Sequence, residues 1–456
     1  MRNKMKITAK EAQARPALVP KLRFPEFRER EAWKGVPLSE LVGALDAGVS
    51  VNSGDRPATG NEVGILKTSA VTNGIFEPQE NKVVFDEAER DRVKEPVQGG
   101  TIIISRMNTP ALVGANAYVE TGFKNLYLPD RLWAAKAKPG TSMRFVASIL
   151  GSDKGRAALS KLAKGSSGSM KNITKPDVLA ILVVAPSPAE QEKIAECLSS
   201  LDELLAAQAR KVDALKTHKK GLMQQLFPRE GETQPRLHFF EFKNGGEWQD
   251  TTVGGLVEEG CLFAPKDGNH GNIHPKASDY VAKGIPFIMA SDLSGGLIDT
   301  KNCHFISKEQ AHSLKKGFAK QGDILLSHKG TVGEVAVVRN IDTPYLMLTP
   351  QVTYYRVKDR KKLSDEFLAQ LFVADAFQTN LVEVSGGGTR AYIGITEQAK
   401  LRVQLPIDVE EQKRIASCLS SLDVLITAET QKYETIKTHK KGLMQQLFPS
   451  AQAYEP

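Results

Sequence analysis

Two glycine-rich stretches flanked by basic residues carry the clearest potential for chemistry in this chain. One is Lys164–Asn172, with the sequence KGSSGSMKN, and the other is Ser385–Tyr392, with the sequence SGGGTRAY. Small residues beside Lys171 or Arg390 would let backbone amides approach a phosphate. Neither stretch has the spacing of a Walker A motif or of a dinucleotide-binding fingerprint. A place close to DNA and an ordinary flexible loop are therefore equally good interpretations.

Basic residues also follow a matching strand in each half of the chain. Arg106 opens RMNTP after the run GTIIIS, and His328 and Lys329 open HKGTVG after the run GDILLS. Turns of this kind could enter a groove of a nucleic acid, although plain hairpin turns explain them equally well. The predicted DNA-contacting set is Arg106, Lys164, Lys171, His328, Lys329, Arg390 and Tyr392.

The sequence contains no persuasive signature of catalysis. It has no NPPY-like or DPPY-like methyltransferase motif, no GxGxxG at a strand–helix turn, and no GxxxxGK[ST], HExxH or GxSxG. Pro129–Lys138, PDRLWAAKAK, resembles a degenerate nuclease pattern, but its counterpart Thr349–Val357, TPQVTYYRV, lacks the acid. The four cysteines lack CxxC spacing, which argues against a zinc site and a disulfide framework. We expect no catalytic residue and no metal or cofactor site in this chain.

The segment KTHKKGLMQQLFP occurs twice without a single change, at Lys216–Pro228 and at Lys437–Pro449. The similarity extends upstream, because the 39 residues that begin at Glu190 and at Glu411 share 26 identities at a constant offset. A repeat period this long indicates tandem domains rather than a solenoid. The two tails therefore serve the same purpose twice.

A second match lies near the start of each copy. Pro20–Trp33, PKLRFPEFREREAW, is similar to Pro235–Trp248, PRLHFFEFKNGGEW, and we call these two stretches the lead segments. Between lead segment and tail, 34–180 and 250–400 show short β-like runs followed by helical stretches in equivalent places. This pattern is typical of an α+β domain with a mixed sheet.

Each tail is predicted to be one long helix. Ser187–Glu190 offers an N-cap serine, a proline at the first helical position and a capping-box glutamate, and Asp408–Glu411 offers the cap and the glutamate again. Pro228 and Pro449 mark the ends. Each helix would hold ~38 residues and measure ~57 Å at 1.5 Å per residue.

Apolar residues recur along both helices with spacings that alternate between four and three, as in a coiled coil. The stripe comprises Ile194, Leu198, Leu201, Leu205, Gln208, Val212, Leu215, Lys219, Leu222 and Leu226, and then Ile415, Leu419, Leu422, Ile426, Glu429, Tyr433, Ile436, Lys440, Leu443 and Leu447. Polar residues interrupt it at the same two places in each copy, which often fixes register. We favour an antiparallel pair related by a pseudo-twofold axis. The alternative is that each helix packs separately onto its own domain.

The repeated segment also carries polar and small residues that a helix does not need. A glycine inside a helix costs ~1 kcal/mol relative to alanine, so its presence in both copies suggests close helix approach or a docking surface. A neutral glycine carried along by duplication is the alternative, and the KTHKK cluster is most simply a solvated face. The predicted partner-docking residues are Gly221, Gln224, Gln225, Gly442, Gln445 and Gln446.

Bulk properties set the remaining expectations. The net charge of +8 permits an anionic partner without requiring one. No secretory signal and no run of about 18 apolar residues is present, so we expect a cytoplasmic protein without a membrane span. The predicted division is a mobile extension at 1–19, domains at 20–185 and 229–405, spacer helices at 186–228 and 406–449, and a tail at 450–456.

The arrangement resembles the specificity (S) subunit of Type I restriction–modification enzymes. The residues that carry the resemblance are the duplicated EQ-KIA-CLSSLD and KKGLMQQLFP tails, the two lead segments, and GDILLSHKGTVGE. The resemblance implies two target-recognition domains joined by two antiparallel helical spacers, each domain reading one half of a split, asymmetric DNA site. The long basic extension before Pro20 departs from the family pattern.

The resemblance also implies partners. The expected ones are double-stranded DNA, two modification (methyltransferase) subunits and restriction (translocase and nuclease) subunits, with S-adenosylmethionine, ATP and Mg used by those subunits. Identical tails suit this, since two copies of one partner need two equivalent surfaces. The rival is a coiled-coil protein scaffold without DNA readout. A self-contained endonuclease or methyltransferase is disfavoured by the missing motifs.

Overall fold

The computed structural model describes residues 18–164, 170–385 and 392–449. The chain divides into two compact units: unit 1 holds residues 1–208 and 432–456, and unit 2 holds residues 209–431. The predicted N-terminal extension up to residue 17, the tail from residue 450, and Arg390 lie outside the described residues. The predicted domain boundaries remain predictions.

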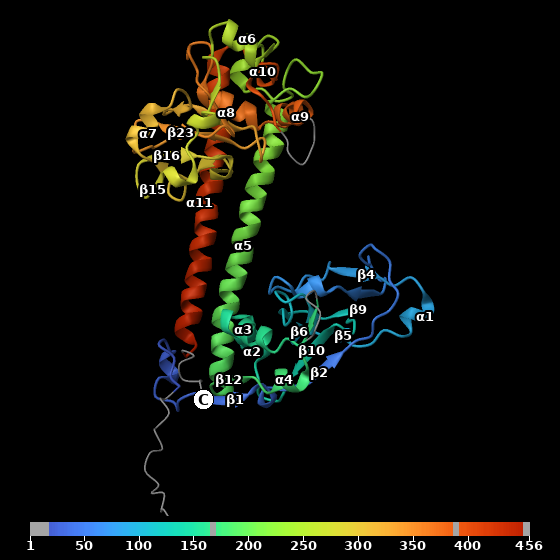
Figure 1. Ribbon diagram of the computed structural model, residues 1–456. Helices are drawn as coiled ribbons and strands as arrows, with labels where there is room; N and C mark the ends of the chain where they lie inside the picture. Colours follow the sequence, from blue (N-terminus) through green and yellow to red (C-terminus); the bar gives the residue numbers. More distant parts are fainter. Residues whose placement is uncertain (1–17, 165–169, 386–391, 450–456) are drawn as a thin grey trace, which may run out of the picture. The chain divides into compact units, whose positions relative to one another are not determined.

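Two helices of 39 residues each dominate the ribbon, α5 (Pro188–Leu226) and α11 (Val409–Leu447) (Figure 1). α5 begins at the expected proline, whose missing N–H is not needed in a first turn. α11 is capped by Asp408, whose carboxylate accepts a hydrogen bond from the Glu410 amide at 2.8 Å. Each helix ends two residues before a proline. The predicted pair of long helices is confirmed.

Unit 1 is built from two four-stranded sheets with small helices beside them. Its strands are β1 (Lys34–Pro37), β2 (Val42–Ala47), β3 (Gly64–Leu66), β4 (Asn81–Val83), β5 (Pro96–Val97), β6 (Thr101–Ser105), β7 (Met107–Asn108), β8 (Asn116–Val119), β9 (Phe123–Tyr127), β10 (Leu132–Ala137), β11 (Lys171–Asn172) and β12 (Leu182–Ala185). Its short helices are α1 (Glu87–Arg90), α2 (Met143–Gly151), α3 (Asp153–Lys161) and α4 (Lys175–Leu179). One sheet has the order β2-β10-β6-β8 and is antiparallel, and the other has the order β4-β3-β9-β5 with β3 and β9 parallel.

Unit 2 repeats this plan with a second mixed sheet. Its strands are β13 (Gln249–Thr252), β14 (Lys266–Asp267), β15 (Tyr280–Val281), β16 (Ile285–Ile288), β17 (Leu293–Ser294), β18 (Leu297–Ile298), β19 (His304–Ile306), β20 (Phe318–Ala319), β21 (Ile324–Ser327), β22 (Val335–Val337), β23 (Leu346–Leu348), β24 (Val352–Tyr355) and β25 (Arg402–Leu405). Its short helices are α6 (Val253–Glu258), α7 (Lys308–Ser313), α8 (Asp365–Val373), α9 (Asp375–Val384) and α10 (Ile395–Gln398). The sheets have the orders β14-β24-β21-β22 and β15-β19-β16-β23-β20, and β16 and β23 are parallel. The predicted α+β class with mixed sheets is confirmed.

Sequence chemistry explains the strands that carry the candidate residues. β6, TIIIS, and β21, ILLS, are buried along their whole length, and each pairs with strands on both sides. Continuous β-branched and aliphatic runs of this kind suit a strand covered on both faces. Each strand leads directly into one of the predicted basic turns, so the turns start from fixed points.

The first and last strands of each domain pair with each other, so the chain enters and leaves each domain at the same place. β1 pairs antiparallel with β12, aligning Lys34 with Ala185, and α5 begins three residues later. β13 pairs in the same way with β25, aligning Gln249 with Leu405, and α11 follows. The lead segment of each copy is therefore held beside the first turn of that copy's long helix.

Candidate functional site

The two long helices run antiparallel where they meet inside each unit. In unit 1, Leu447 of α11 packs with Ile194 and Leu198 of α5, while Lys440 forms an ion pair with Asp202. Rising numbers on α5 thus meet falling numbers on α11. All the predicted stripe residues are buried or half-buried.

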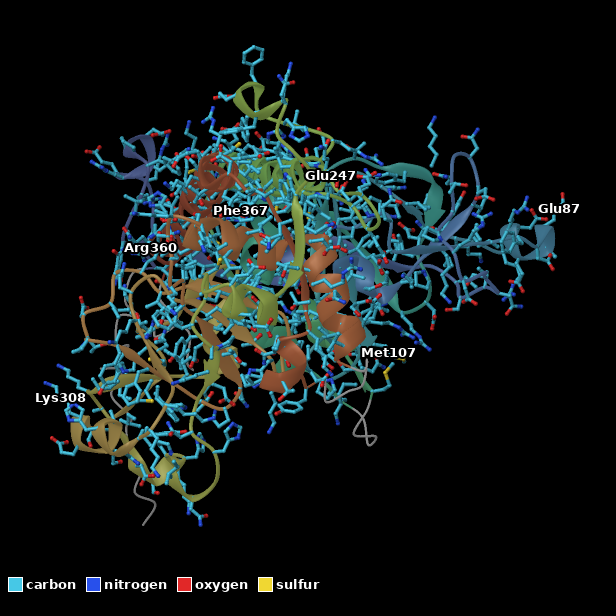
Figure 2. All side chains as sticks on the ribbon, turned by 90° about the horizontal axis from the view of Figure 1, so that it is seen from above. Glu87, Met107, Glu247, Lys308, Arg360 and Phe367 are labelled. Carbon is cyan, nitrogen blue, oxygen red and sulfur yellow. The ribbon has the colours of Figure 1, made fainter. Side chains whose placement is uncertain are left out.

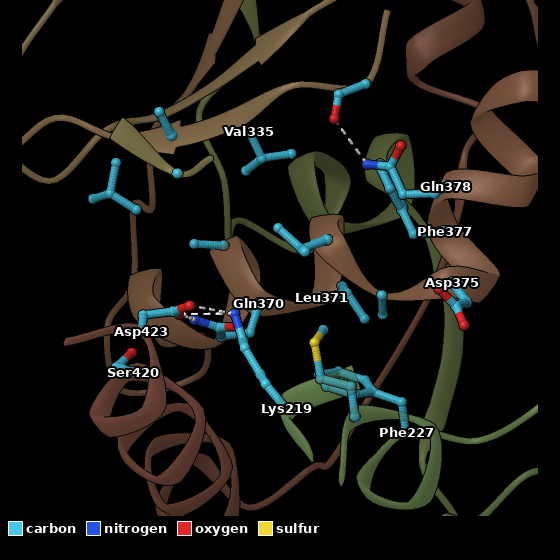
Figure 3. A pocket seen from close by; sticks show the side chains of 18 of the residues that line it. Lys219, Phe227, Val335, Gln370, Leu371, Asp375, Phe377, Gln378, Ser420 and Asp423 are labelled. Carbon is cyan, nitrogen blue, oxygen red and sulfur yellow. Dashed lines mark hydrogen bonds and ion pairs between the residues drawn. The ribbon is translucent and has the colours of Figure 1, made fainter. Parts of the chain in front are cut away.

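Unit 2 contains the equivalent ion pair. Lys219 Nζ lies 2.7 and 2.8 Å from the two carboxylate oxygens of Asp423, and Gln370 of α8 donates to the same carboxylate at 2.9 Å (Figure 3). Lys219 and Lys440 occupy the same place in the two copies, as do Asp202 and Asp423. The lysine that interrupts each stripe is therefore matched by an acid on the facing helix, which supports a role in fixing register.

The apolar residues of the repeated segment pack inside the chain. In unit 1, Phe448 lies 6.2 Å from Trp33 and 5.7 Å from Phe145, measured between ring centroids. In unit 2, Phe227 lies 5.9 Å from Trp248 and 5.6 Å from Phe367. Each aromatic trio joins a lead segment, a domain helix and the repeated segment that belongs to the other copy.

A buried carboxylate ties the first lead segment to α5. Glu190, in the first turn of α5, accepts hydrogen bonds at 2.8 Å from Arg23 Nε and Arg23 Nη2, and at 3.1 Å from Trp33 Nε1. The Arg23 and Glu190 side chains are only 6% and 1% exposed. Glu190 thus binds the lead segment, a role that the expected capping box did not suggest. The only sequence signal for this contact was the presence of Arg23 and Trp33 in the lead segment.

Unit 2 has a looser version of the same arrangement. His238, which replaces Arg23, places Nδ1 at 3.6 Å from Glu411, and both side chains are largely buried. Burial raises the pKa of Glu411 above its ordinary 4.5, because a buried charged carboxylate loses its hydration, while His238 and Trp248 partly oppose that shift. The two arrangements thus differ by an arginine in hydrogen-bond contact with the carboxylate in one copy and a more distant histidine in the other.

The glutamine that follows each of these glutamates holds the domain helix. Gln191 accepts from the Ser142 amide at 3.3 Å and Gln412 accepts from the Ser364 amide at 2.9 Å. These serines precede α2 and α8. The duplicated EQ dipeptide therefore clamps a lead segment and a domain helix to the start of each long helix.

The predicted docking residues lie on the outer face of the repeated segment. A Cβ atom at Gly221 or Gly442 would meet nothing within 4 Å, so close approach within this chain does not explain either glycine. Gln225, Gln445 and Gln446 are exposed. Gln224 is exposed too, and its Nε2 donates to Asp375 at 2.9 Å.

A groove of about 1490 Å³ lies beside the first of these segments in unit 2. It is lined by Lys219, Gln370 and Asp423, and by apolar side chains that include Leu371 and Phe377 (Figure 3). Gln224 also lines it. The groove thus joins a predicted docking residue to a mixed polar and apolar surface.

In unit 1 the structure brings three predicted DNA-contacting residues together. β7, which follows Arg106, pairs antiparallel with β11, which begins at Lys171. Asn172 also forms a bridge with Lys164, and the Arg106 carbonyl accepts the Ile173 amide at 3.0 Å. Met107, the first residue of β7, is labelled in Figure 2. Arg106, Lys164 and Lys171 are therefore neighbours.

The side chains of this cluster differ in their partners. Lys164 Nζ lies 2.7 Å from Asp177 and lowers the pKa of that carboxyl. Arg106 Nη2 lies 3.6 Å from Asp130, and Arg106 Nε is buried without a hydrogen-bond partner among the described residues. Lys164 is the more neutralised of the two cations.

Unit 2 has the equivalent pairing with different side chains. Lys329 forms an antiparallel bridge with Tyr392, and the His328 carbonyl accepts the Ile393 amide at 3.0 Å. Lys329 Nζ lies 6.0 Å from the centre of the exposed Tyr392 ring. Gly330 and Gly333 have φ values of 84° and 100°, which explains the glycines of KGTVG.

His328 lies beneath this bridge and does not reach the surface. It is 0% exposed, its Nδ1 lies 2.9 Å from Thr353 Oγ1, and burial lowers its pKa to about 4. Its Nε2 has no hydrogen-bond partner in the described part of the chain. The exposed groups of the pairing are Lys329 and Tyr392.

The described ranges contain neither a cluster of metal ligands nor a helix suited to a membrane. Between residues 18 and 449, outside the gaps at 165–169 and 386–391, no three His, Cys, Asp or Glu side chains are placed to hold a metal ion. Over the same ranges, no helix combines the length and the apolar character needed to cross a bilayer.

Comparison with known proteins shows which family of proteins this chain is similar to. A model of the Type I restriction modification DNA specificity domain matches residues 247–438. This span covers the second domain and most of α11. The predicted resemblance to the specificity subunits of Type I restriction–modification enzymes is thereby confirmed.

Individual proteins similar to this chain are also specificity subunits of Type I restriction enzymes. The Type I restriction enzyme MjaVIII specificity subunit of Methanocaldococcus jannaschii is 25% identical over 274 residues, which are 59% of this chain and 61% of that subunit. The EcoBI specificity subunit of Escherichia coli is 24% identical over 284 residues, which are 57% of this chain and 55% of that subunit. The chain thus spans less than two thirds of either relative.

A solved structure shares the fold over a longer span. The crystal structure of the Type-I restriction-modification system S subunit from M. genitalium matches with a TM-score of 0.62 and 15% identity. The match covers 95% of this chain and all of that one. At this identity the likeness concerns the fold alone.

Proposed function

We propose that this chain is the DNA sequence-specificity subunit of a Type I restriction–modification complex. The observation that carries the proposal is the pairing of a basic turn with the described end of a glycine-rich sequence at equivalent places in both units, with different side chains in each. Equivalent frames with different surface groups suit two different half-sites of one split, asymmetric DNA site. Arg106, Lys171, Lys329, Arg390 and Tyr392 would contact the DNA.

His328 has a supporting role in this proposal. A side chain that is fully buried cannot touch a base edge, whereas one that bonds Thr353 can hold the turn from below. The contact from this turn would come from Lys329, which is exposed beside Tyr392. Lys164, already paired with Asp177, would contribute mainly to the positive field.

The exposed faces of the two repeated segments would bind two modification subunits. Intramolecular packing explains the apolar positions that the two copies share, but it does not explain Gly221 and Gly442 or the exposed glutamines beside them. In unit 2 the groove beside Gln224 enlarges the surface that a modification subunit could cover. Restriction subunits would join the same complex.

The chemistry would belong to the partners. The sequence has no motif for methyl transfer or for nucleotide hydrolysis, so we propose that this chain is a non-catalytic subunit. S-adenosylmethionine would serve the modification subunits, and ATP and Mg would serve the restriction subunits. This chain would supply the DNA sequence that they act on.

Methylation profiling of host DNA tests the proposal directly. We expect a split motif of two half-sites that disappears when the gene is deleted. Replacing residues 250–400 with the corresponding stretch of a relative should change one half-site and keep the other. Methylation profiles that stay identical after deletion would contradict a role in DNA specificity. If the chain were a protein scaffold, the assembled complex would show no salt-sensitive, sequence-selective DNA binding.

Arginine at the open glycine positions tests the docking surfaces. The side chains of Gly221→Arg and Gly442→Arg would start in open space, because nothing lies within 4 Å of either added Cβ. Native mass spectrometry should show two modification subunits on the wild type, one on each single variant and none on the double variant. Ala207→Arg, on an exposed part of α5 outside the repeated segment, is the matched control and should keep both. A double variant that still binds two subunits would refute this docking surface.

A further inference from the structure

Equivalent positions of the two units leave a buried nitrogen without a hydrogen-bond partner in the described chain. In unit 1 the nitrogen is Nε of Arg106, and in unit 2 it is Nε2 of His328. Both residues directly follow a buried inner strand of a sheet, and the carbonyl of each accepts the amide of the isoleucine that follows the glycine-rich stretch, Ile173 or Ile393. Buried polar atoms without a partner are rare, so a repeated one requires an explanation.

The backbone of Arg106 is held by two hydrogen bonds, while its buried side-chain Nε has no acceptor among the described residues. Its N–H donates to the Arg131 carbonyl at 3.0 Å and its carbonyl accepts the Ile173 amide at 3.0 Å. The guanidinium carries five N–H donors. Its closest acidic contact, Nη2 to Asp130 at 3.6 Å, is longer than a hydrogen bond. The side chain is 29% exposed, so it can reach a ligand without rebuilding the strand.

Asp130 is itself held in place. Ser50 donates a hydrogen bond to one of its carboxylate oxygens, and the other oxygen faces Arg106. A carboxylate this close to the guanidinium disfavours a phosphate at the same spot, because two anions would then be adjacent. It leaves neutral acceptors as the better partners for Arg106. A base edge offers such acceptors, whereas the non-bridging oxygens of a phosphate carry negative charge.

His328 occupies the equivalent position in unit 2, where the side chain is fully buried. It is 0% exposed and lies beneath the bridge between Lys329 and Tyr392. A single buried imidazole cannot offer the parallel donors of a guanidinium. The difference between Arg106 and His328 is therefore a difference in what the two units can read.

We propose that Arg106 reads a guanine in the half-site bound by unit 1, donating two hydrogen bonds to O6 and N7 in the major groove, with Asp130 as its positioning residue. Of the four bases, guanine alone presents two adjacent acceptors there, which match the guanidinium fork. The inference rests on the proposed function, since it assigns a base to a residue of the proposed DNA interface.

Modified DNA tests this pairing atom by atom. The full-length tagged chain is isolated with its bound subunits, and its affinity is measured for its own site with 7-deazaguanine, which lacks N7, at each guanine in turn. For the wild type, one position in the half-site of unit 1 should weaken binding about ten-fold. Arg106→Ala should bind the natural and the deaza sites equally, while sensitivity in the other half-site stays unchanged.

Two further variants separate base reading from charge and from folding. Arg106→Lys keeps the charge but not the fork, so it should keep the salt dependence of binding and lose the 7-deazaguanine effect. Arg131→Ala removes an exposed charge from the neighbouring residue and should keep the effect. Asp130→Asn should keep the preferred base and bind other sequences more tightly.

Three outcomes overturn the inference. One is a 7-deazaguanine effect of the same size in Arg106→Ala and in the wild type. Another is a uniform loss of affinity across sequences with a smaller salt slope, which would assign Arg106 to a phosphate. The third is a wild-type complex that is sequence-selective but insensitive to every guanine of this half-site. A wild-type complex without any sequence selectivity would instead refute the proposed function.

Discussion

Removing Arg23 should destabilise unit 1 far more than removing His238 destabilises unit 2. Arg23 and Glu190 make two hydrogen bonds of 2.8 Å with side chains 6% and 1% exposed. Breaking a buried pair by deleting one partner typically costs about 3–5 kcal/mol, because the remaining charge is left without compensation. His238 approaches Glu411 only to 3.6 Å, so we expect His238→Ala to cost about 1 kcal/mol.

The assay must report each unit separately. Native-state hydrogen exchange at the amides of the second turns of α5 and α11 does so, because the first turns hold the two glutamates and their own amides lack helical hydrogen bonds. Arg23→Ala should speed exchange at the start of α5 and leave the start of α11 unchanged, and His238→Ala should have a small effect confined to the start of α11. A double change of Arg23 and Glu190 to methionine should recover much of the loss, since an apolar pair leaves no buried charge.

Two results would refute this reasoning. If Arg23→Ala costs less than about 1 kcal/mol, the buried pair does not hold the lead segment against α5. If Arg23→Ala and His238→Ala cost the same, the permanent charge and the shorter contacts of unit 1 make no difference. In the second case the aromatic trios, which are alike in both units, would be the main attachment.

The remaining predictions concern pH, salt and spacing. Since the folded carboxyl of Glu411 keeps its proton to a higher pH than the unfolded one, the free energy of unfolding of unit 2 should fall as pH rises from 4.5 through the raised pKa. Glu411→Gln should reduce that slope in melting curves across this range. Lys171→Ala and Arg390→Ala should each lower DNA affinity across sequences and reduce the salt slope of binding by roughly one charge, and an unchanged slope would make these loops ordinary. One heptad inserted after Val212 and after Tyr433 keeps the stripe in phase and adds ~10 Å of helix, so methylation profiling should show a gap ~3 base pairs longer with weaker binding; an active variant with its original gap would show that the helices do not set the spacing.

Sequence periodicity predicted the long helices because their signals are local and repeated. Proline at the first helical position, the alternating spacing of the stripe and proline after the end all act within a few residues of each other. The α+β class followed in the same way from runs such as TIIIS and ILLS. The pairing of β7 with β11 was not predictable, although both stretches were singled out, because more than 60 residues separate them.

The contacts of Glu190 and Glu411 were missed for a related reason. A glutamate three residues after an N-cap serine or aspartate is the usual signature of a capping box, and this local explanation hid the long-range one. Arg23 and Trp33 recur as His238 and Trp248 in the second lead segment. Both were visible, but only the fold shows that they surround the same carboxylate.

The identical segments are best understood as two faces under different constraints. On the inner face, Phe227 and Phe448 enter equivalent aromatic trios, so any change would have to suit a lead segment and a domain helix at once. That constraint explains the apolar half of KTHKKGLMQQLFP. It does not reach Gly221 and Gly442, where a side chain would meet nothing and where alanine would favour the helix by ~1 kcal/mol. A residue that lowers helix stability and fills no space in the chain makes sense if a second molecule approaches there, and its presence in both copies makes sense if that molecule binds twice.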